Sequence, residues 1–277
     1  MKKPIVIYHG TCADGFSAAW VFWQQYKDEY EYFAGVYGKP HPDVTDRDVY
    51  LVDFSYKRNI IEQMISVAKS VTLIDHHKTA IDDLKDLTGL NQFVSIDMSG
   101  ATLAWKFVHP TLDVSERPLL LGHIEDNDLW RFKLPSTKEI QSYVYSQDYD
   151  FEQWDRMMNA DQVELMKMTV AGAAINRKHQ KDVKELIKIC QREMTVAGFT
   201  VPSASLPYTM ASDAAGTMSV GHPFAVCYYD TQDSRVFSLR STETGEDVSL
   251  IAQQYGGGGH KHASGFRVPR DHILATS

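Results

Sequence analysis

The sequence predicts an α/β protein with a parallel sheet, joined by a long helix to a smaller second α/β domain. Three observations predict this: short apolar runs alternate with helical patterns in the first half, a helical pattern without proline fills Asp161–Met194, and hairpin-like strands with a glycine-rich segment follow. The 277 residues are enough for two domains. We expect a first domain over residues 1–160, a helical connector over 161–198 and a second domain over 199–277.

Each apolar run of the first half leads into a histidine or an aspartate. Ile5–Tyr8 leads into His9, Val49–Val52 into Asp53, Val71–Ile74 into Asp75, and Phe93–Ile96 into Asp97. Helical patterns over Ser17–Tyr26 and Asn59–Ser70 separate the first three runs. Continuous apolar strands joined by helices indicate a parallel sheet covered on both faces. In such sheets ligands bind beyond the carboxyl ends of the strands, so these polar residues are expected at a binding site.

Several carboxylates at one sheet edge repel one another unless cations lie among them. A single aspartate after a strand is usually a helix N-cap, but three or four in succession favour a divalent metal site. Asp75-His76-His77 is the most specific element. Residues that leave a strand point to alternate sides, so one histidine can bind a metal while the other reaches a substrate. A further group of acidic and imidazole side chains, His123–Asp128, is either part of a site or a solvated helix end.

A glycine-rich segment, Tyr255–Phe266, is the second specific feature. Its four consecutive glycines, Gly256–Gly259, leave their backbone N–H groups open to a close ligand, and a following helix N-terminus would attract anions. A flexible linker is the alternative, but the Phe266–Val268 pattern beyond the glycines is typical of a strand. Upstream, Ala225–Tyr229 and Arg235–Ser241 alternate like the strands of a hairpin, which makes Arg240 available to a phosphate.

The composition limits the class of partner. Lys and Arg number 28 against 36 Asp and Glu, a formal net charge of −8, so we expect no long nucleic-acid partner. The three cysteines show no CxxC spacing, which argues against a disulfide scaffold or a thiolate zinc site. No apolar run approaches the roughly 20 residues that span a bilayer, and no signal peptide is recognisable. We expect a cytoplasmic protein that binds a small anionic substrate and no membrane.

In this order, the motifs resemble those of the DHH/DHHA1 phosphoesterase family, and the resemblance covers nearly the whole chain. The residues that carry it are His9 with Asp14, Asp53, Asp75-His76-His77, Asp126, Ser238–Ser241, Gly256–Gly259 with His260, and Ala263–Phe266. The family includes nano-RNA and linear-dinucleotide phosphodiesterases, phosphoadenosine-phosphate phosphatases, single-strand exonucleases and exopolyphosphatases. The resemblance implies a DHH domain and a DHHA1 domain with the active site in the cleft between them, and one or two Mn²⁺, Mg²⁺ or other divalent ions.

The resemblance also implies a role for each matching residue. One metal would be held by His9, Asp14 and Asp53, and a second by Asp53, His76 and Asp126. Asp75 and His77 would be the catalytic residues, with His77 facing the substrate phosphate. The implied substrate-binding residues are Arg240, Ser241, Gly257, Gly258, Gly259 and His260.

The first motif departs from the family pattern. Many members have Asp-x-Asp where this chain has Asp14-Gly15-Phe16, so we expect one ligand of the second metal to be missing. That metal would then bind weakly, recruit Asp128 or water, or arrive with the substrate.

The implied function is hydrolysis of phosphodiester, phosphate-ester or phosphoanhydride bonds in short nucleotide substrates. A nucleotide-binding module with weak or no turnover and an exopolyphosphatase-like hydrolase are the alternatives, and the acidic balance disfavours a processive exonuclease. The sequence leaves the oligomeric state open, with a homodimer as one possibility.

Overall fold

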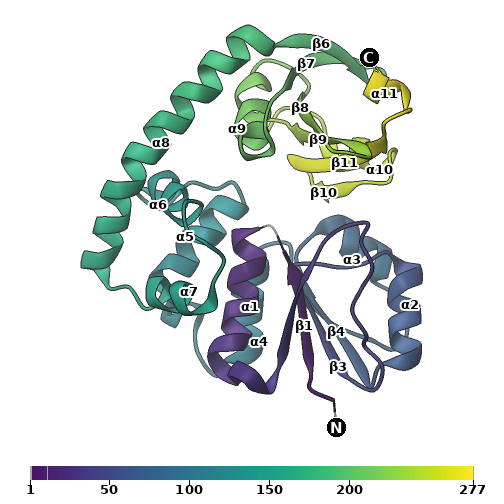
Figure 1. Ribbon diagram of the computed structural model, residues 1–277, viewed down its shortest axis with the longest axis vertical. Coiled ribbons are helices and arrows are strands. Elements are labelled where there is room, and N and C mark those ends of the chain that lie inside the picture. Colours follow the sequence, from purple (N-terminus) through teal and green to yellow (C-terminus); the bar gives the residue numbers. More distant parts are fainter. Residues whose placement is uncertain (1, 11, 277) are drawn as a thin grey trace. The chain divides into compact units, whose positions relative to one another are not determined.

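A computed structural model describes residues 2–10 and 12–276. The chain divides into two compact units, the first ending at Asn176 and the second beginning at Arg177. The first unit contains a parallel sheet with helices on both faces, and the second contains its own sheet (Figure 1). The predicted α/β class, with a parallel sheet followed by a second α/β region, is confirmed. The boundaries at residues 160 and 198 stay predictions.

The sheet of the first unit has the strand order β2-β1-β3-β4-β5, with all neighbouring strands parallel. Its strands are β1 (Ile5–His9), β2 (Glu31–Gly35), β3 (Asp48–Val52), β4 (Ser70–Asp75) and β5 (Leu90–Val94). The apolar runs predict β1, β3 and β4 because these strands are covered on both faces. Edge strand β2 has mostly exposed or half-buried residues and therefore gives no such run. The prediction for Phe93–Ile96 is shifted: β5 ends at Val94, and Asp97 lies in an exposed turn.

Helices cover both faces of this sheet. Figure 1 shows α1 (Ala13–Tyr26) and α4 (Gly100–Val108) on one side, and α2 (Arg58–Val67) and α3 (Lys78–Leu84) on the other. The predicted helices over 17–26 and 59–70 correspond to α1 and α2. Three further helices complete the unit: α5 (Leu119–Asp128), α6 (Thr137–Val144) and α7 (Phe151–Met158).

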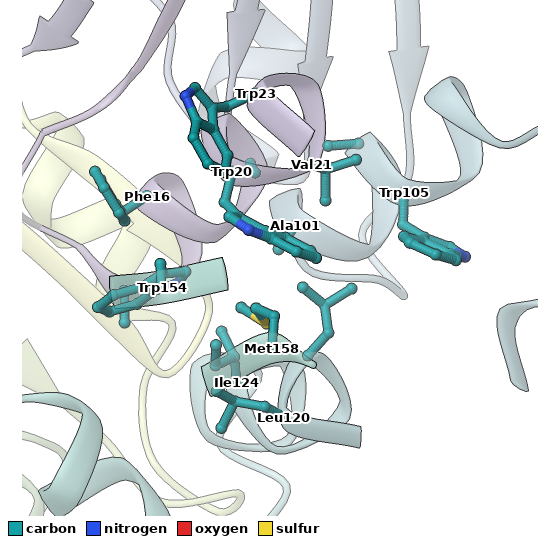
Figure 2. Packing of buried hydrophobic residues seen from close by; sticks show 14 of the residues in the cluster. Phe16, Trp20, Val21, Trp23, Ala101, Trp105, Leu120, Ile124, Trp154 and Met158 are labelled. Atoms are coloured by element: carbon teal, nitrogen blue, oxygen red, sulfur yellow. The ribbon is translucent and has the colours of Figure 1, made fainter. Parts of the chain in front are cut away.

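The largest core of the first unit lies between α1, α4 and the helices α5–α7. Figure 2 shows Trp20 of α1, Ala101 of α4 and Trp154 of α7 packed together, with Leu120 and Ile124 of α5 beside them. The indole of Trp154 donates a hydrogen bond to Ser17 Oγ, so its polar atom is satisfied inside the core. This packing fixes the N-terminal ends of α1 and α4 against the sheet.

The topological switch point of the sheet lies at β1, because the strands that follow β1 in sequence are added on both sides of it. β2 pairs with one side of β1, and β3 pairs with the other. Ligands bind in open α/β sheets at such a switch point, outside the carboxyl ends of the strands. His9 ends β1 and Asp53 directly follows β3, so both predicted residues flank this point.

Helix α8 (Gln162–Cys190) contains the division between the units. The sequence predicts a helix to Met194, which is wrong by four residues at the end. Met194 belongs to β6 (Arg192–Val196), whose residues alternate between exposed and buried, a strand period that the preceding helical pattern obscures. Ala197 and Gly198 both have positive φ angles, of 50° and 83°, and form the tight turn into β7 (Phe199–Ser205).

The second unit is built on a sheet with the order β10-β11-β9-β8-β7-β6. Its remaining elements are α9 (Tyr208–Met218), β8 (Ala225–Asp230), β9 (Ser234–Arg240), α10 (Val248–Gln253), β10 (Gly258–His260), β11 (Ala263–Pro269) and α11 (Ile273–Thr276). The predicted hairpin is present as the antiparallel pair β8–β9, and the predicted strand around Phe266 is β11. The glycine run leads into strand β10, and helix α10 precedes it, so the run is not followed directly by a helix N-terminus.

Among residues 2–10 and 12–276, no helix is long and apolar enough to cross a membrane, and this holds for the 29-residue α8 as well.

Candidate metal centre

The strand ends of the first unit bring acidic and imidazole side chains together. His9 ends β1, Asp53 follows β3, and Asp75 ends β4 and leads into His76. Parallel register places these ends at one edge, because Tyr8 pairs with Val52 and Val52 pairs with Ile74. Asp53 is 1% exposed, and Asp75 and His76 are fully buried. Buried charges of this kind are found where they are paired or coordinate metals.

His76 lies at the centre of three carboxylates. Its Nε2 is 3.0 Å from Asp53 Oδ1, 3.4 Å from Asp128 Oδ2 and 3.8 Å from Asp14 Oδ2. The second carboxylate oxygen of Asp53, Oδ2, lies 3.6 Å from His9 Nδ1. The structure therefore brings four of the five predicted metal residues together and adds Asp128, which the sequence offers only as a substitute.

Helix α4 holds Asp14 in this cluster. The first backbone N–H groups of α4 donate to its carboxylate, Gly100 N to Oδ2 at 2.7 Å and Ala101 N to Oδ1 at 3.2 Å. The N-terminus of a helix favours a negative charge, since its N–H groups have no partner within the helix. Ser99 caps α4 by accepting a hydrogen bond from Thr102 N.

Two glycines permit this close approach. A Cβ at Gly100 would lie 2.5 Å from Asp53 Cβ, and a Cβ at Gly15 would lie 2.5 Å from both His9 Cβ and His9 O. Asp53 itself has a φ of 53°, in the left-handed region that non-glycine residues seldom adopt. Such strained backbone costs about 1–3 kcal/mol and is concentrated at functional sites.

Asp75 orients the second histidine of the motif. Its Oδ1 accepts hydrogen bonds from His77 Nδ1 at 2.7 Å, from His76 N at 2.7 Å and from His77 N at 3.2 Å. Although burial opposes protonation, the charge of Asp75 and this hydrogen bond raise the pKa of His77 above its usual value. The pKa of Asp75 is lowered, because the attraction of His77 outweighs the effect of burial.

The electrostatics of the cluster show crowded negative charge. Burial, followed by the charges of Asp53 and Asp128, raises the pKa of Asp14 well above its usual value. Burial also raises the pKa of Asp128. Burial works against a protonated His76, but the three surrounding carboxylates raise its pKa to about 10. Burial opposes the ionised form of Asp53, but the hydrogen bond from His76 and the neighbouring imidazoles outweigh it and lower the pKa of Asp53.

The cluster fits a divalent cation. Among the described residues, the buried atoms of the cluster that lack a hydrogen-bond partner include His9 Nδ1, Asp53 Oδ2, Asp75 Oδ2 and Asp128 Oδ2. Within the described part of the first unit, three sets of side chains have possible ligand atoms within 4.8 Å of one another: Asp53 with Asp75, His76 and His77; His9 with Cys12 and Asp53; and Asp14 with His76 and Asp128. Carboxylate oxygens with imidazole nitrogens suit Mn²⁺ or Mg²⁺. The chemistry of these donors therefore agrees with a metal centre of one or two ions.

Asp126, the remaining predicted ligand, is not in this cluster. Its carboxylate accepts hydrogen bonds from Lys133 N, Leu134 N and Thr137 Oγ1, at 2.8, 3.0 and 2.7 Å. Two residues along a helix are about 200° apart around its axis, so Asp126 and Asp128 of α5 point to opposite sides. Asp126 stabilises the loop before α6 through hydrogen bonds, and Asp128 lies beside His76.

Phe16 is not at a ligand position either. It is 3% exposed, and its ring stacks on Phe151 with centroids 4.7 Å apart, inside the core of Figure 2. The spacing of Asp-x-Asp is matched on the other side of Asp14, where Cys12-Ala13-Asp14 places a thiol near His9 and Asp53. The family motif compares Asp14 with the residues that follow it and therefore gives no signal for Cys12.

The predicted substrate-binding residues all lie in the second unit. His260 of β10 pairs with Ala263 of β11, which pairs with Arg240 of β9, so His260 and Arg240 lie in one row across the sheet. Directly paired residues in antiparallel strands point to the same face. Arg240 donates to Ser212 Oγ at 2.8 Å and to the carbonyl of Leu239.

Ser241 and the glycines have clear contacts within the second unit. Ser241 Oγ donates to Glu246 O at 2.7 Å. Gly258 and Gly259 form part of β10. A Cβ at Gly257 would lie 2.1 Å from Gly265 O, so close packing against the neighbouring strand requires a glycine there. The binding roles of these residues stay predictions.

The fold is that of the DHH-domain proteins, as the sequence resemblance implies. The DHH domain of a member of the s1p family of ribosomal proteins matches with a TM-score of 0.56 and 13% identity, over 96% of this chain and 83% of that one. A pGpG-specific phosphodiesterase from Vibrio cholerae matches with a TM-score of 0.48 and 14% identity, over 97% and 94% of the two chains. In sequence, the chain is 29% identical over 291 residues to the uncharacterized protein R106 of Acanthamoeba polyphaga mimivirus, covering 96% of this chain and 67% of that protein. No protein-family model matches the chain.

Proposed function

We propose that this protein is a metal-dependent phosphohydrolase that cleaves phosphodiester, phosphate-ester or phosphoanhydride bonds of short nucleotide substrates. The observation that carries the proposal is the buried cluster at the switch point of the parallel sheet. There, Asp53 and His9 each have a buried atom without a hydrogen-bond partner. The fold of the DHH-domain proteins and the sequence motifs that resemble the DHH/DHHA1 phosphoesterases support the same class of reaction.

The residues of the cluster would have two roles: some would bind the metal ions, and others would donate a proton. A divalent ion, when bound, supplies positive charge that neutralises phosphate oxygens and activates water for attack on phosphorus. Asp53 would bridge two such ions, since its oxygens face His76 on one side and His9 on the other. Asp14 and Asp128 would complete one ligand set with His76.

His77 would supply charge and a proton at the phosphate. Its raised pKa keeps the imidazole protonated up to a higher pH than usual, and Asp75 fixes the ring through Nδ1–H. A protonated imidazole attracts a phosphate oxygen and can donate its proton to the departing oxygen. Asp75 would act through His77 by holding the orientation of its ring.

A short substrate is supported by the charge of the chain. A net charge of −8 disfavours binding along a long polyanion, whereas bound cations and a few arginines are enough for a small one. The family resemblance implies that Arg240, Ser241, Gly257, Gly258, Gly259 and His260 bind the substrate.

The proposal is tested with a panel of short substrates in the presence of Mn²⁺, Mg²⁺ or EDTA. The panel contains linear dinucleotides, oligonucleotides of three to five residues, a nucleoside bisphosphate, pyrophosphate and short polyphosphate. We expect multiple turnovers on at least one nucleotide substrate with a divalent ion, and none with EDTA. Asp53→Asn is the matched inactive control, because asparagine keeps the shape of the side chain and tolerates a left-handed backbone.

Each outcome separates the proposal from the alternatives. Binding of nucleotides without multiple turnover would indicate a binding module. Turnover limited to polyphosphate would indicate an exopolyphosphatase-like hydrolase. Activity that is unchanged in Asp53→Asn would remove the cluster from the reaction.

A further inference from the structure

Cys12 lies at the entrance to helix α1 without capping it. It occupies the N-cap position with an extended backbone, φ −128° and ψ 138°, and its side chain makes no capping hydrogen bond. Serine, threonine, asparagine and aspartate are the usual N-cap residues, because their oxygens accept from the first N–H groups of the helix. Capping therefore does not explain a cysteine here.

The thiol faces two potential metal ligands. Possible ligand atoms of His9, Cys12 and Asp53 all lie within 4.8 Å of one another. Asp53 is 1% exposed, and its Oδ2 is a buried atom without a hydrogen-bond partner. Ligand atoms around one transition-metal ion lie about 3–4.5 Å apart, since each bond is about 2.0–2.3 Å long. Small side-chain rotations would thus bring the three atoms onto one ion.

The other side of Asp53 has a different set of donors. Asp14, His76 and Asp128 provide only oxygen and imidazole nitrogen. The backbone of α4 holds both oxygens of Asp14, which keeps this carboxylate on the side of His76. Cys12 therefore takes the place on the side of His9 that a second carboxylate would fill.

We propose that Cys12 is a thiolate ligand of the metal ion held by His9 and Asp53. A thiolate favours zinc, iron(II) or cobalt(II) over Mg²⁺, whereas carboxylates and imidazole suit Mn²⁺ or Mg²⁺. The two metal positions would then differ in metal preference, with the softer ion on the side of Cys12. This inference rests on the metal centre of the proposed function.

The direct test is a titration of the metal-free full-length protein with Co²⁺, followed by absorption spectroscopy. Cobalt–thiolate bonds give an intense near-ultraviolet charge-transfer band that oxygen and imidazole ligands do not give. We expect this band in the wild type and its loss in Cys12→Ser, with Co²⁺ affinity at that position reduced at least about tenfold. Cys190→Ser is the matched control, because Cys190 is also partly buried but lies in the second unit, and it should keep the band.

Three results would overturn the proposal. A band that persists in Cys12→Ser would show that another group supplies the sulfur, and loss of the band in Cys190→Ser would identify that group. Co²⁺ binding by the wild type without the band, abolished by Asp53→Asn, would retain the metal centre and reject Cys12 as its ligand. No Co²⁺ binding by the wild type at all would reject both.

Alkylation of the wild type gives a second measurement that does not depend on how a variant folds. Iodoacetamide labelling of Cys12 and Cys190 is followed by mass spectrometry, with Co²⁺ or with EDTA. Coordination should slow the labelling of Cys12 at least about tenfold and leave Cys190 unchanged, because only the thiolate form reacts and the metal occupies it. Equal labelling of Cys12 under both conditions would contradict coordination.

Discussion

The candidate functional residues of the two units differ in the hydrogen bonds that they make. In the first unit, His9 and Asp53 each have a buried atom that lacks a hydrogen-bond partner, and Asp53 lies in strained backbone. In the second unit, Ser241 donates to Glu246 O and Arg240 donates to Ser212. Each buried unpaired group costs about 1–3 kcal/mol. Binding of a cation would therefore stabilise the first arrangement, whereas Ser241 and Arg240 already donate hydrogen bonds within their own unit.

The glycines of the two units differ in the same way. Gly100 lets helix α4 approach Asp53, whereas Gly257 lets the chain pack against Gly265 of the neighbouring strand. Loss of the first glycine should affect a ligand site, and loss of the second should affect the fold. A glycine-rich or charged motif therefore indicates a ligand site only where its contacts leave ligand atoms unsatisfied.

Gly100→Ala should have the largest effect and should act on the metal centre. The added Cβ would lie 2.5 Å from Asp53 Cβ, so Asp53 must move. A displacement of about 1 Å in such a site costs about 100-fold in activity, and we expect at least that loss together with weaker Mn²⁺ binding. Hydrolysis of the best short substrate and calorimetric Mn²⁺ titration measure the two effects.

Gly122→Ala is the matched control for this change. Gly122 lies within helix α5, and the nearest atom to an added Cβ is 3.6 Å away, an ordinary contact. Alanine should stabilise this helix by about 0.5–1 kcal/mol and leave activity unchanged. If Gly100→Ala behaved like Gly122→Ala, the close approach of α4 to Asp53 would be irrelevant to the site.

Arg240→Ala tests whether the second unit has a function beyond its own stability. If Arg240 binds the substrate, as the resemblance implies, KM should rise about 10- to 150-fold, the equivalent of a lost charge-assisted hydrogen bond of about 1.5–3 kcal/mol. Mn²⁺ affinity should stay the same, because a protonated guanidinium offers no lone pair to a metal ion and Arg240 belongs to the second unit. Steady-state kinetics and urea unfolding distinguish the two roles: a lower unfolding free energy with unchanged KM would make Arg240 purely structural.

Asp128→Asn and Asp126→Asn form a matched pair on one helix. Asp128 Oδ2 lies 3.4 Å from His76 Nε2, so its loss should weaken Mn²⁺ binding about 10- to 100-fold. Asp126 accepts three hydrogen bonds from the loop before α6 and from Thr137, so its loss should lower the free energy of unfolding by about 1–3 kcal/mol with Mn²⁺ affinity kept. The reverse pattern in the titrations would restore Asp126 as the ligand.

The smallest expected effect is a pH dependence of the metal-free fold. The pKa of His76 is raised to about 10 from its usual 6.5. The stabilisation that protonated His76 gives the folded state is therefore fully present below pH 6.5 and is lost as the pH rises through 10. Urea unfolding in EDTA should show a lower stability at pH 8.5 than at pH 6, by about 1–3 kcal/mol. The difference should shrink in His76→Asn, and a stability that rises with pH in the wild type would contradict the crowded negative charge around His76.

The parallel sheet and the grouping of His9, Asp53 and Asp75 could be predicted, because both follow from short apolar runs in the sequence. The apolar runs before His9, Asp53 and Asp75 are continuous, and parallel pairing brings their ends to one edge. Strand β2 is not predictable in this way, since its edge position leaves no apolar run.

The remaining candidate ligands could not be predicted, because the spacing of residues in the sequence does not show which way their side chains point. Asp126 and Asp128 are both aspartates and lie two residues apart, so only the packing of α5 decides which carboxylate faces His76. Phe16 and Cys12 are a second case, because the start of α1 turns the aromatic ring of Phe16 into the core of Figure 2 and brings the thiol of Cys12 near Asp53. The turn at Ala197 and Gly198 could have indicated the end of the predicted connector helix, since a glycine there is typical of a hairpin.

The most direct test of a metal centre in the first unit is a calorimetric titration of the metal-free protein with Mn²⁺. The wild type and Arg240→Ala should bind the ion with the same affinity, and Asp53→Asn should bind it at least about 10- to 100-fold more weakly. Circular dichroism of the three proteins checks that each is folded. Equal Mn²⁺ binding by the wild type and Asp53→Asn, or no divalent ion bound by the wild type, would contradict the account.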